Sequence, residues 1–142
     1  MREIEFEILG KPIHKKRARF DHRPGKKAYN PQKSEEGRWV LEALTQITPE
    51  IHKHLPLTGP IFLKLRFLMP TTKEFSRAKA AGLPTFAFAH VNSPDLDNLI
   101  KFVKDCCNVW LWKDDSQVYH VDAFKIYGVQ PMTVVKIIEM GG

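Results

Sequence analysis

Alternating polar and apolar residues define two segments of this 142-residue chain and limit the folds open to it. Residues 2–9 alternate strictly, which is typical of a strand with one buried face. Residues 60–69 follow the same pattern, and two further strands are predicted near the end of the chain, at about 117–127 and 132–139. These strands predict a sheet that presents one apolar face.

Helical periodicity occupies the segments between the strands. Residues 31–48 carry apolar side chains at helical spacing, with Asn30 as the predicted N-cap and Pro49 as the residue that kinks or ends the helix. A short helix is predicted over 73–81 and a longer one over 95–107. This order of elements predicts an α/β (α+β) fold, in which helices pack against a small mixed sheet.

The chain is basic, with 22 Lys and Arg against 16 Asp and Glu and a net charge of +6 at pH 7. Its length suits one domain, so residues 1–142 are expected to form a single unit. Positive charge favours an acidic partner such as nucleic acid or an anionic surface. Residues 11–30 are predicted to be a basic loop, because two prolines and a glycine argue against regular structure there. This loop carries eight positive residues: Lys11, Lys15, Lys16, Arg17, Arg19, Arg23, Lys26 and Lys27.

The two cysteines, Cys106 and Cys107, are adjacent and cannot build a disulfide framework, which fits a reducing compartment. The first residues are charged where a signal peptide needs an apolar run, and no apolar stretch approaches the length of a membrane span. We therefore expect a soluble cytoplasmic protein with no membrane partner.

An acidic motif begins the predicted helix over 95–107: Pro94 is followed by Asp95, Leu, Asp97, Asn, Leu, Ile and Lys101. Two helical residues two positions apart point about 200° away from each other. Asp95 and Asp97 can therefore converge only if Asp95 is extended and the helix starts beside it, with Lys101 one turn further on. In a purely structural alternative, Asp95 caps the helix, Asp97 complements its dipole and Lys101 pairs with Asp97.

A second acidic pair, Asp114 and Asp115, follows this helix by a short turn and precedes a strand. Asp115 is therefore expected to return to the helix start. Two carboxylates about 5 Å apart repel by about 3 kcal/mol at an effective dielectric near 20, so a cluster of three favours a bound divalent cation. The oxygen ligands predict Mg²⁺, with Mn²⁺ as a substitute, in an acidic metal-site region over residues 94–118.

These motifs resemble the RusA-type Holliday junction resolvases, a family encoded widely in bacteria and prophages. The similarity rests on residues 94–101, on Asp105 in the same helix, on 112–118, and on the basic N-terminal motifs at 10–12 and 16–19. The resemblance implies a homodimeric, Mg²⁺-dependent endonuclease of α/β fold that acts on four-way DNA junctions.

The same resemblance implies roles for individual residues. The metal-binding catalytic acids would be Asp95, Asp97 and Asp115, and Lys101 would be the catalytic lysine. The positive residues of the 11–30 loop would contact DNA phosphates. The predicted activity is paired phosphodiester hydrolysis at Holliday junctions, in DNA recombination and repair, with no small-molecule cofactor.

Alternative functions remain open at this point. One is a non-catalytic basic nucleic-acid-binding module, and another is a metal nuclease that acts on flaps or other branched DNA. A glycosyltransferase with an Asp-x-Asp donor site is disfavoured, because 142 residues leave little room for a nucleotide-sugar-binding domain.

Overall fold

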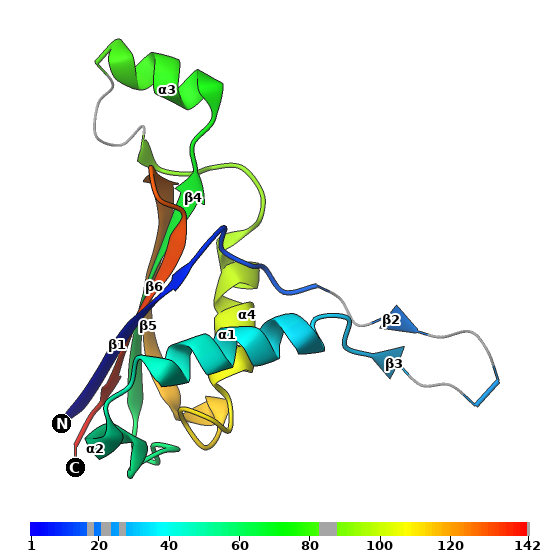
Figure 1. The fold of residues 1–142 in the computed structure, drawn as a ribbon, viewed down its shortest axis with the longest axis vertical. Coiled ribbons are helices and arrows are strands. Elements are labelled where there is room, and N and C mark those ends of the chain that lie inside the picture. The colour runs from blue at the N-terminus through cyan, green and yellow to red at the C-terminus, as the bar shows by residue number, and fades with distance from the viewer. Residues whose placement is uncertain (17–18, 21–23, 26–27, 83–87, 142) are drawn as a thin grey trace.

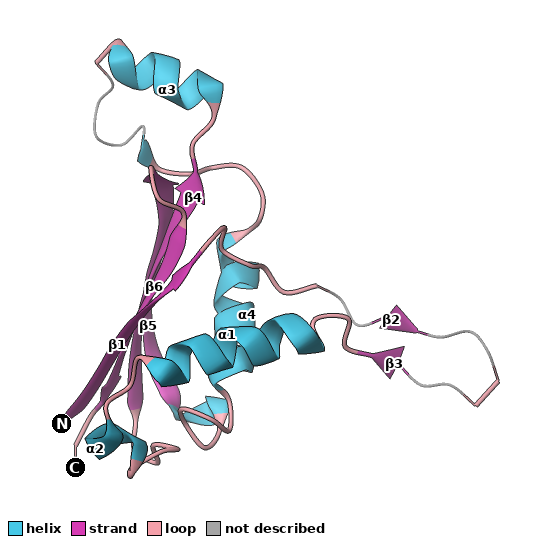
Figure 2. Cartoon of the chain, viewed as in Figure 1, coloured by secondary structure: helices cyan, strands magenta, loops and turns pink. Residues whose placement is uncertain are grey.

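The computed structural model describes residues 1–16, 19–20, 24–25, 28–82 and 88–141. A four-stranded sheet has the order β1-β6-β4-β5. The strands are β1 (Arg2–Leu9), β4 (Ile61–Pro70), β5 (Val118–Gly128) and β6 (Met132–Glu139). β6 pairs antiparallel with β1 and β4, whereas β5 lies parallel to β4 at the edge. The helices α1 (Lys33–Thr45) and α4 (Leu96–Cys107) lie on one side of this sheet (Figures 1 and 2). The predicted α/β class with a small mixed sheet is confirmed.

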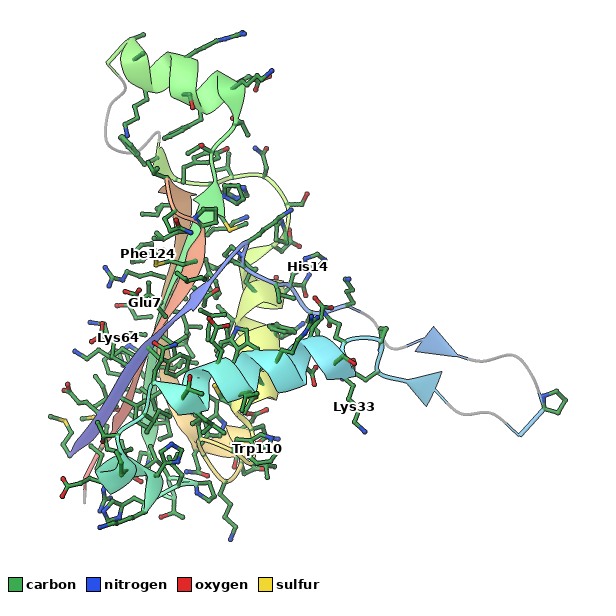
Figure 3. All side chains as sticks on the ribbon, viewed as in Figure 1. Glu7, His14, Lys33, Lys64, Trp110 and Phe124 are labelled. Atoms are coloured by element: carbon green, nitrogen blue, oxygen red, sulfur yellow. The ribbon has the colours of Figure 1, made fainter. Side chains whose placement is uncertain are left out.

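The strands form because their two faces differ in polarity. In β4, Ile61, Leu63 and Leu65 are buried while Lys64 and Arg66 are exposed. The observed strands start and end within one residue of the predicted bounds. The polar side of the sheet faces away from the helices, as the labelled Glu7, Lys64 and Phe124 illustrate in Figure 3.

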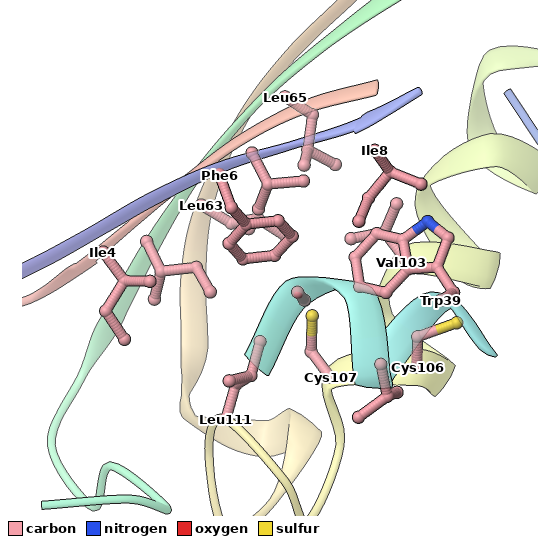
Figure 4. Packing of buried hydrophobic residues seen from close by; sticks show 14 of the residues in the cluster. Ile4, Phe6, Ile8, Trp39, Leu63, Leu65, Val103, Cys106, Cys107 and Leu111 are labelled. Atoms are coloured by element: carbon pink, nitrogen blue, oxygen red, sulfur yellow. The ribbon is translucent and has the colours of Figure 1, made fainter. Parts of the chain in front are cut away.

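The core fills the space between the sheet and the two helices (Figure 4). Trp39 of α1 joins the layers, since its ring lies edge-on to Phe6 of β1 at 5.5 Å and to Phe102 of α4 at 6.4 Å between ring centroids. Cys106 and Cys107 are buried in this core, and burial raises the pKa of both thiols. Both cysteines therefore remain protonated packing residues.

Helix α1 differs from its prediction at both ends. Gln32 is the N-cap in place of Asn30, whose side-chain Oδ1 instead accepts a hydrogen bond from the Gln32 backbone N–H at 2.9 Å. The helix ends at Thr45, and Pro49 begins a separate short helix, α2 (Pro49–His52). Proline suits a first helical position because its missing N–H would have no partner there.

The basic segment contains a pair of short strands, so the prediction of an irregular loop over 11–30 is wrong in part. β2 (Arg19–Phe20) pairs antiparallel with β3 (Ala28–Tyr29), away from the sheet and helices in Figure 1. Pro24 and Gly25 lie in a turn between these strands, with Gly25 at φ 78°. Proline and glycine are turn residues of a hairpin here, so their presence does not exclude flanking strands. Arg17, Arg23, Lys26 and Lys27 lie outside the described residues.

Helix α3 (Lys73–Ala80) stands beyond the end of the sheet in Figure 1, and its predicted position is confirmed. Thr72 caps it, since its side-chain oxygen accepts a hydrogen bond from the Phe75 N–H at 3.0 Å. Among the helices of the described ranges, none has the length and apolar character needed to cross a bilayer.

Candidate active site at the start of helix α4

Asp95 occupies the position between the incoming chain and helix α4. Its backbone is extended, with φ −66° and ψ 145°, and its side chain makes no capping hydrogen bond to the helix. The condition under which Asp95 and Asp97 can converge is therefore met: an extended Asp95 beside the first turn. Asp95 is the N-cap residue of α4, as the structural alternative predicts, but its carboxylate makes no capping hydrogen bond to the helix. This exposed carboxylate is left for another role.

Asp97 and Lys101 lie one turn apart on the same helix face, as predicted. The Lys101 Nζ is 3.7 Å from the Asp97 Oδ2, and the two side chains are 63% and 67% exposed respectively. An ion pair so exposed contributes about 0–1 kcal/mol to stability. Stability alone therefore gives little reason for this pair, and both groups are reachable from solvent.

Lys125 of β5 fixes the chain that leads into Asp95. Its ammonium donates hydrogen bonds to the backbone carbonyls of Asn92 and Pro94, at 2.5 Å and 2.6 Å. The backbone N–H of His90 donates to the Lys125 carbonyl at 3.1 Å. Sequence reasoning missed this lysine. A signal was present, because Lys125 interrupts the alternation on the side of β5 that carries Val121 and Ala123.

The segment before the hairpin lies against the start of α4. The Lys15 N–H donates to the Asn98 carbonyl at 2.9 Å, one residue from Asp97. The Lys15 Nζ contacts Asp105 at 2.7 Å and Glu36 at 3.3 Å, which links α4 to α1. Burial lowers the pKa of Lys15, but the two carboxylates outweigh it and the net pKa is raised. Lys15 thus neutralises helix carboxylates, and its predicted phosphate contact stays a prediction.

The second acidic pair has two different local environments. The Asp114 carboxylate accepts a hydrogen bond from the Ser116 N–H at 2.9 Å and caps the short 3₁₀ turn that follows. Hydrogen bonding with the Ser116 side chain, and then with its backbone N–H, lowers the pKa of Asp114. The Asp115 Oδ1 accepts a hydrogen bond from the indole N–H of Trp112 at 2.8 Å, and Trp112 is fully buried. Asp114 has a capping role, whereas Asp115 is held in place by a core side chain.

Asp115 lies at the opposite end of α4 from Asp95. The twelve residues of α4 span about 18 Å. Asp115 comes just before β5, whose first residue Val118 pairs with Ile61, the first residue of β4. Lys125, which holds the Asp95 side, is seven residues further along β5, about 23 Å away. Figure 3 agrees with this separation, because Trp110 in the turn after α4 lies at the opposite end of the molecule from α3.

The prediction that Asp115 returns to the helix start within one chain is therefore wrong. β5 runs parallel to β4 and begins where α4 ends, so a short turn leaves Asp115 at that end. In the part of the chain that the structure describes, no three His, Cys, Asp or Glu side chains are grouped so that they could hold a metal ion.

The start of α4 nevertheless suits one class of metal ion. Mg²⁺ usually keeps several waters and binds one or two protein carboxylates together with substrate phosphates. Asp95 and Asp97 offer two exposed carboxylates two residues apart at the start of α4, with Lys101 one turn further on beside Asp97. The oxygen donors fit Mg²⁺ or Mn²⁺, whereas Zn²⁺ sites prefer nitrogen and sulfur ligands.

Exposed carboxylates at a helix start beside a basic segment suit a protein that holds a divalent metal ion against a phosphodiester. The sequence matches the family described as Endodeoxyribonuclease RusA over residues 10–138, and the chain belongs to this family. The predicted family and enzyme class are confirmed: this is an endodeoxyribonuclease family whose activity is the resolution of Holliday junctions.

The chain is also similar to a bacterial relative over nearly its whole length. It is 33% identical over 146 residues to the uncharacterized protein YqaN of Bacillus subtilis strain 168, and the alignment covers 96% of each chain.

Proposed function

We propose that this protein is a Mg²⁺-dependent endonuclease that resolves four-way DNA junctions in recombination and repair. The observation that carries the proposal is the start of α4, where two exposed carboxylates that do not cap the helix stand beside an exposed lysine. The net charge of +6 suits a DNA substrate. A non-catalytic binding module would gain nothing from acids at this point, because they repel DNA phosphates.

In this proposal Asp95 and Asp97 hold the metal ion against the scissile phosphate. When bound, the ion supplies an activated water and stabilises the leaving oxygen. The Lys101 ammonium stabilises negative charge that develops on the phosphoryl oxygens. Hydrolysis leaves a 5′ phosphate and a 3′ hydroxyl, which a ligase can reseal.

Asp115 joins the site in this proposal only through a second copy of the chain. In a two-fold dimer every contact occurs twice with the roles exchanged. If the two α4 helices lie antiparallel, the start of one helix approaches the end of the other, so that the partner subunit's Asp115 approaches Asp95 and Asp97. Two equivalent sites then cut two strands of a symmetric junction.

DNA approaches this site along the basic segment that precedes α1. Residues 11–16 contact α4 next to Asp97, and the β2–β3 hairpin continues from there. Exposed Lys11 and Lys16 are suited to phosphate contacts that do not depend on sequence. Binding should therefore weaken steeply as salt is raised.

The proposal predicts a clear phenotype for Asp97→Asn. Cleavage of a synthetic four-way junction in Mg²⁺ should fall by about 100-fold or more, because a metal-binding carboxylate is lost. Junction binding should be unchanged or tighter, because a charge that repels phosphate is removed. Both are measured by gel assays, with flaps and plain duplex as comparison substrates.

Asp122→Asn provides the matched control, since Asp122 is an exposed aspartate of β5 on the polar side of the sheet. The control should cleave at the wild-type rate. Wild-type cleavage by Asp97→Asn would overturn the assignment of the site.

A further inference from the structure

A hollow of about 550 Å³ lies beyond the end of the sheet, between α3 and the end of β5. Its walls include three aromatic rings, and its rim carries two hydroxyl groups and an ammonium group. The residues concerned are Phe75, Phe88, Tyr127, Thr71, Ser76 and Lys79. These side chains take no part in the proposed metal site.

The aromatic walls are held by contacts among themselves. Phe75 is buried and stacks on Tyr127, with 4.3 Å between ring centroids and 23° between planes. Phe88 meets Phe75 edge-on at 5.5 Å. All three rings border the hollow; Phe88 and Tyr127 are half-buried, and buried Phe75 contacts both of them. Rings held in this way need little ordering when a flat ligand binds.

The charge around the hollow is positive. The Lys79 Nζ lies 5.8 Å from the centroid of the Phe88 ring. Lys73 and Arg77 are exposed on the same helix, which carries a single acid, Glu74. Aromatic rings beside cations suit a ligand that joins a flat ring system to an anion, which is the chemistry of a nucleotide.

The hollow is connected to the start of α4 by a short chain segment. The Asn92 side-chain amide donates a hydrogen bond to the Tyr127 hydroxyl at 3.3 Å. Asn92 precedes Asp95 by three residues, which span at most about 11 Å. Stacked DNA rises 3.4 Å per nucleotide along one strand, so the span from Asn92 to Asp95 corresponds to about three stacked nucleotides.

We propose that this hollow binds an unstacked nucleobase, within about three nucleotides of the phosphate that is cut at Asp95 and Asp97. The base stacks against Phe88 and Tyr127, and Lys79 contacts a neighbouring phosphate. This inference rests on the proposed function for the position of the cut. It assigns to α3 the recognition of DNA whose bases have left the helical stack.

The first test replaces the ring that faces the hollow while keeping its apolar volume. Phe88→Leu should weaken binding of a four-way junction by about 5- to 150-fold in Ca²⁺ without Mg²⁺, and Phe88→Tyr should restore it. Phe124→Leu is the control, because Phe124 is an exposed aromatic residue of β5 on the polar side of the sheet. 2-Aminopurine placed within three nucleotides of the cut should be quenched by wild type and by Phe124→Leu, but not by Phe88→Leu. Equal binding and quenching by Phe88→Leu, with an unchanged melting curve, would overturn the proposal.

The second test does not depend on junction cleavage. A single-stranded oligonucleotide that carries 5-iododeoxyuridine is irradiated with the wild-type protein, and the cross-linked peptide is identified by mass spectrometry. Cross-links at Phe88 or Tyr127 would support base binding here, even if the protein cut no junction and the proposed function failed. Cross-links confined to other residues would overturn base binding while leaving the nuclease proposal intact.

Discussion

Four aspartates on or just after α4 have four different environments, although their side chains are identical. Asp105 pairs with Lys15, and Asp114 caps a turn. Asp115 accepts a hydrogen bond from a buried indole. Within the described ranges, Asp97 forms an ion pair with the exposed Lys101. The partners of Asp105 and Asp114 explain the presence of these two residues, whereas Asp95, Asp97 and Asp115 are the acids of the proposed metal site.

Lys101 is predicted to act on the transition state more than on binding. Lys101→Ala should lower the single-turnover cleavage rate by about 100-fold, because a charge next to the reacting phosphate is removed. Its junction affinity should change by less than about threefold, since one phosphate contact contributes modestly to binding. Rates and affinities are measured on the same junction, with exposed Lys64 on the other side of the sheet replaced by alanine as the control. Equal losses of rate and affinity would make Lys101 a binding residue.

Among the elements, β5 both completes the sheet and holds the chain that leads into Asp95. Lys125, near the C-terminal end of this strand, donates hydrogen bonds to the backbone carbonyls of Asn92 and Pro94. The start of α4 is therefore fixed by the sheet as well as by the packing of the helix on the core. Lys125 is a positioning residue, because its ammonium acts on Asp95 only through the backbone before it.

Lys125→Met should remove this support while keeping the length of the side chain. The cleavage rate is expected to fall by about 10- to 100-fold, since small displacements of reacting groups cost that much. Junction affinity and melting temperature should change little, because the released carbonyls lie near solvent and can bind water. Lys125→Arg should recover part of the rate, and Lys64→Met serves as the control. A loss of melting temperature without a loss of rate in the folded protein would contradict this role.

Periodicity predicted the elements well because it reports which face of each element is buried. The strands and α4 are long enough for a pattern to repeat, and their bounds agree with the structure. The β2–β3 hairpin was missed because strands of two residues have no period to detect. Local pattern also identified the extended Asp95 correctly, since Pro94 and the first helical turn are adjacent in sequence.

The position of Asp115 could not be obtained in the same way. It depends on β5 running parallel to β4, which is a property of the sheet and not of any short segment. The contacts of Lys125 are equally distant in sequence, because they join residues about thirty positions apart. Sequence patterns specify neighbours along one element, whereas sheet topology decides which ends of different elements meet.

At the scale of the whole molecule, the proposed dimer can be tested by mixing two inactive chains. Asp97→Asn and Asp115→Asn should each be inactive alone. A purified mixed dimer would have both lesions in one site and none in the other, so it should nick junctions at about half the wild-type rate. Nicked junctions should accumulate in place of resolved duplexes, as seen on denaturing and native gels.

If each site were built within one chain, the mixed dimer would be as inactive as its parents. Sedimentation of the wild-type protein as a monomer at assay concentration would also contradict the shared site.

The two ends of the described fold adjoin one another. Figure 1 shows the N- and C-termini side by side at one end of the sheet. Arg2 and Glu139 are partners in the β1–β6 ladder, and their side chains form an ion pair at 2.8 Å. They lie at the end of the sheet where β4 begins, far from Asp95. A short linker could therefore join residue 139 to residue 2, and a new opening in a surface turn would yield a circularly permuted nuclease with the same sheet.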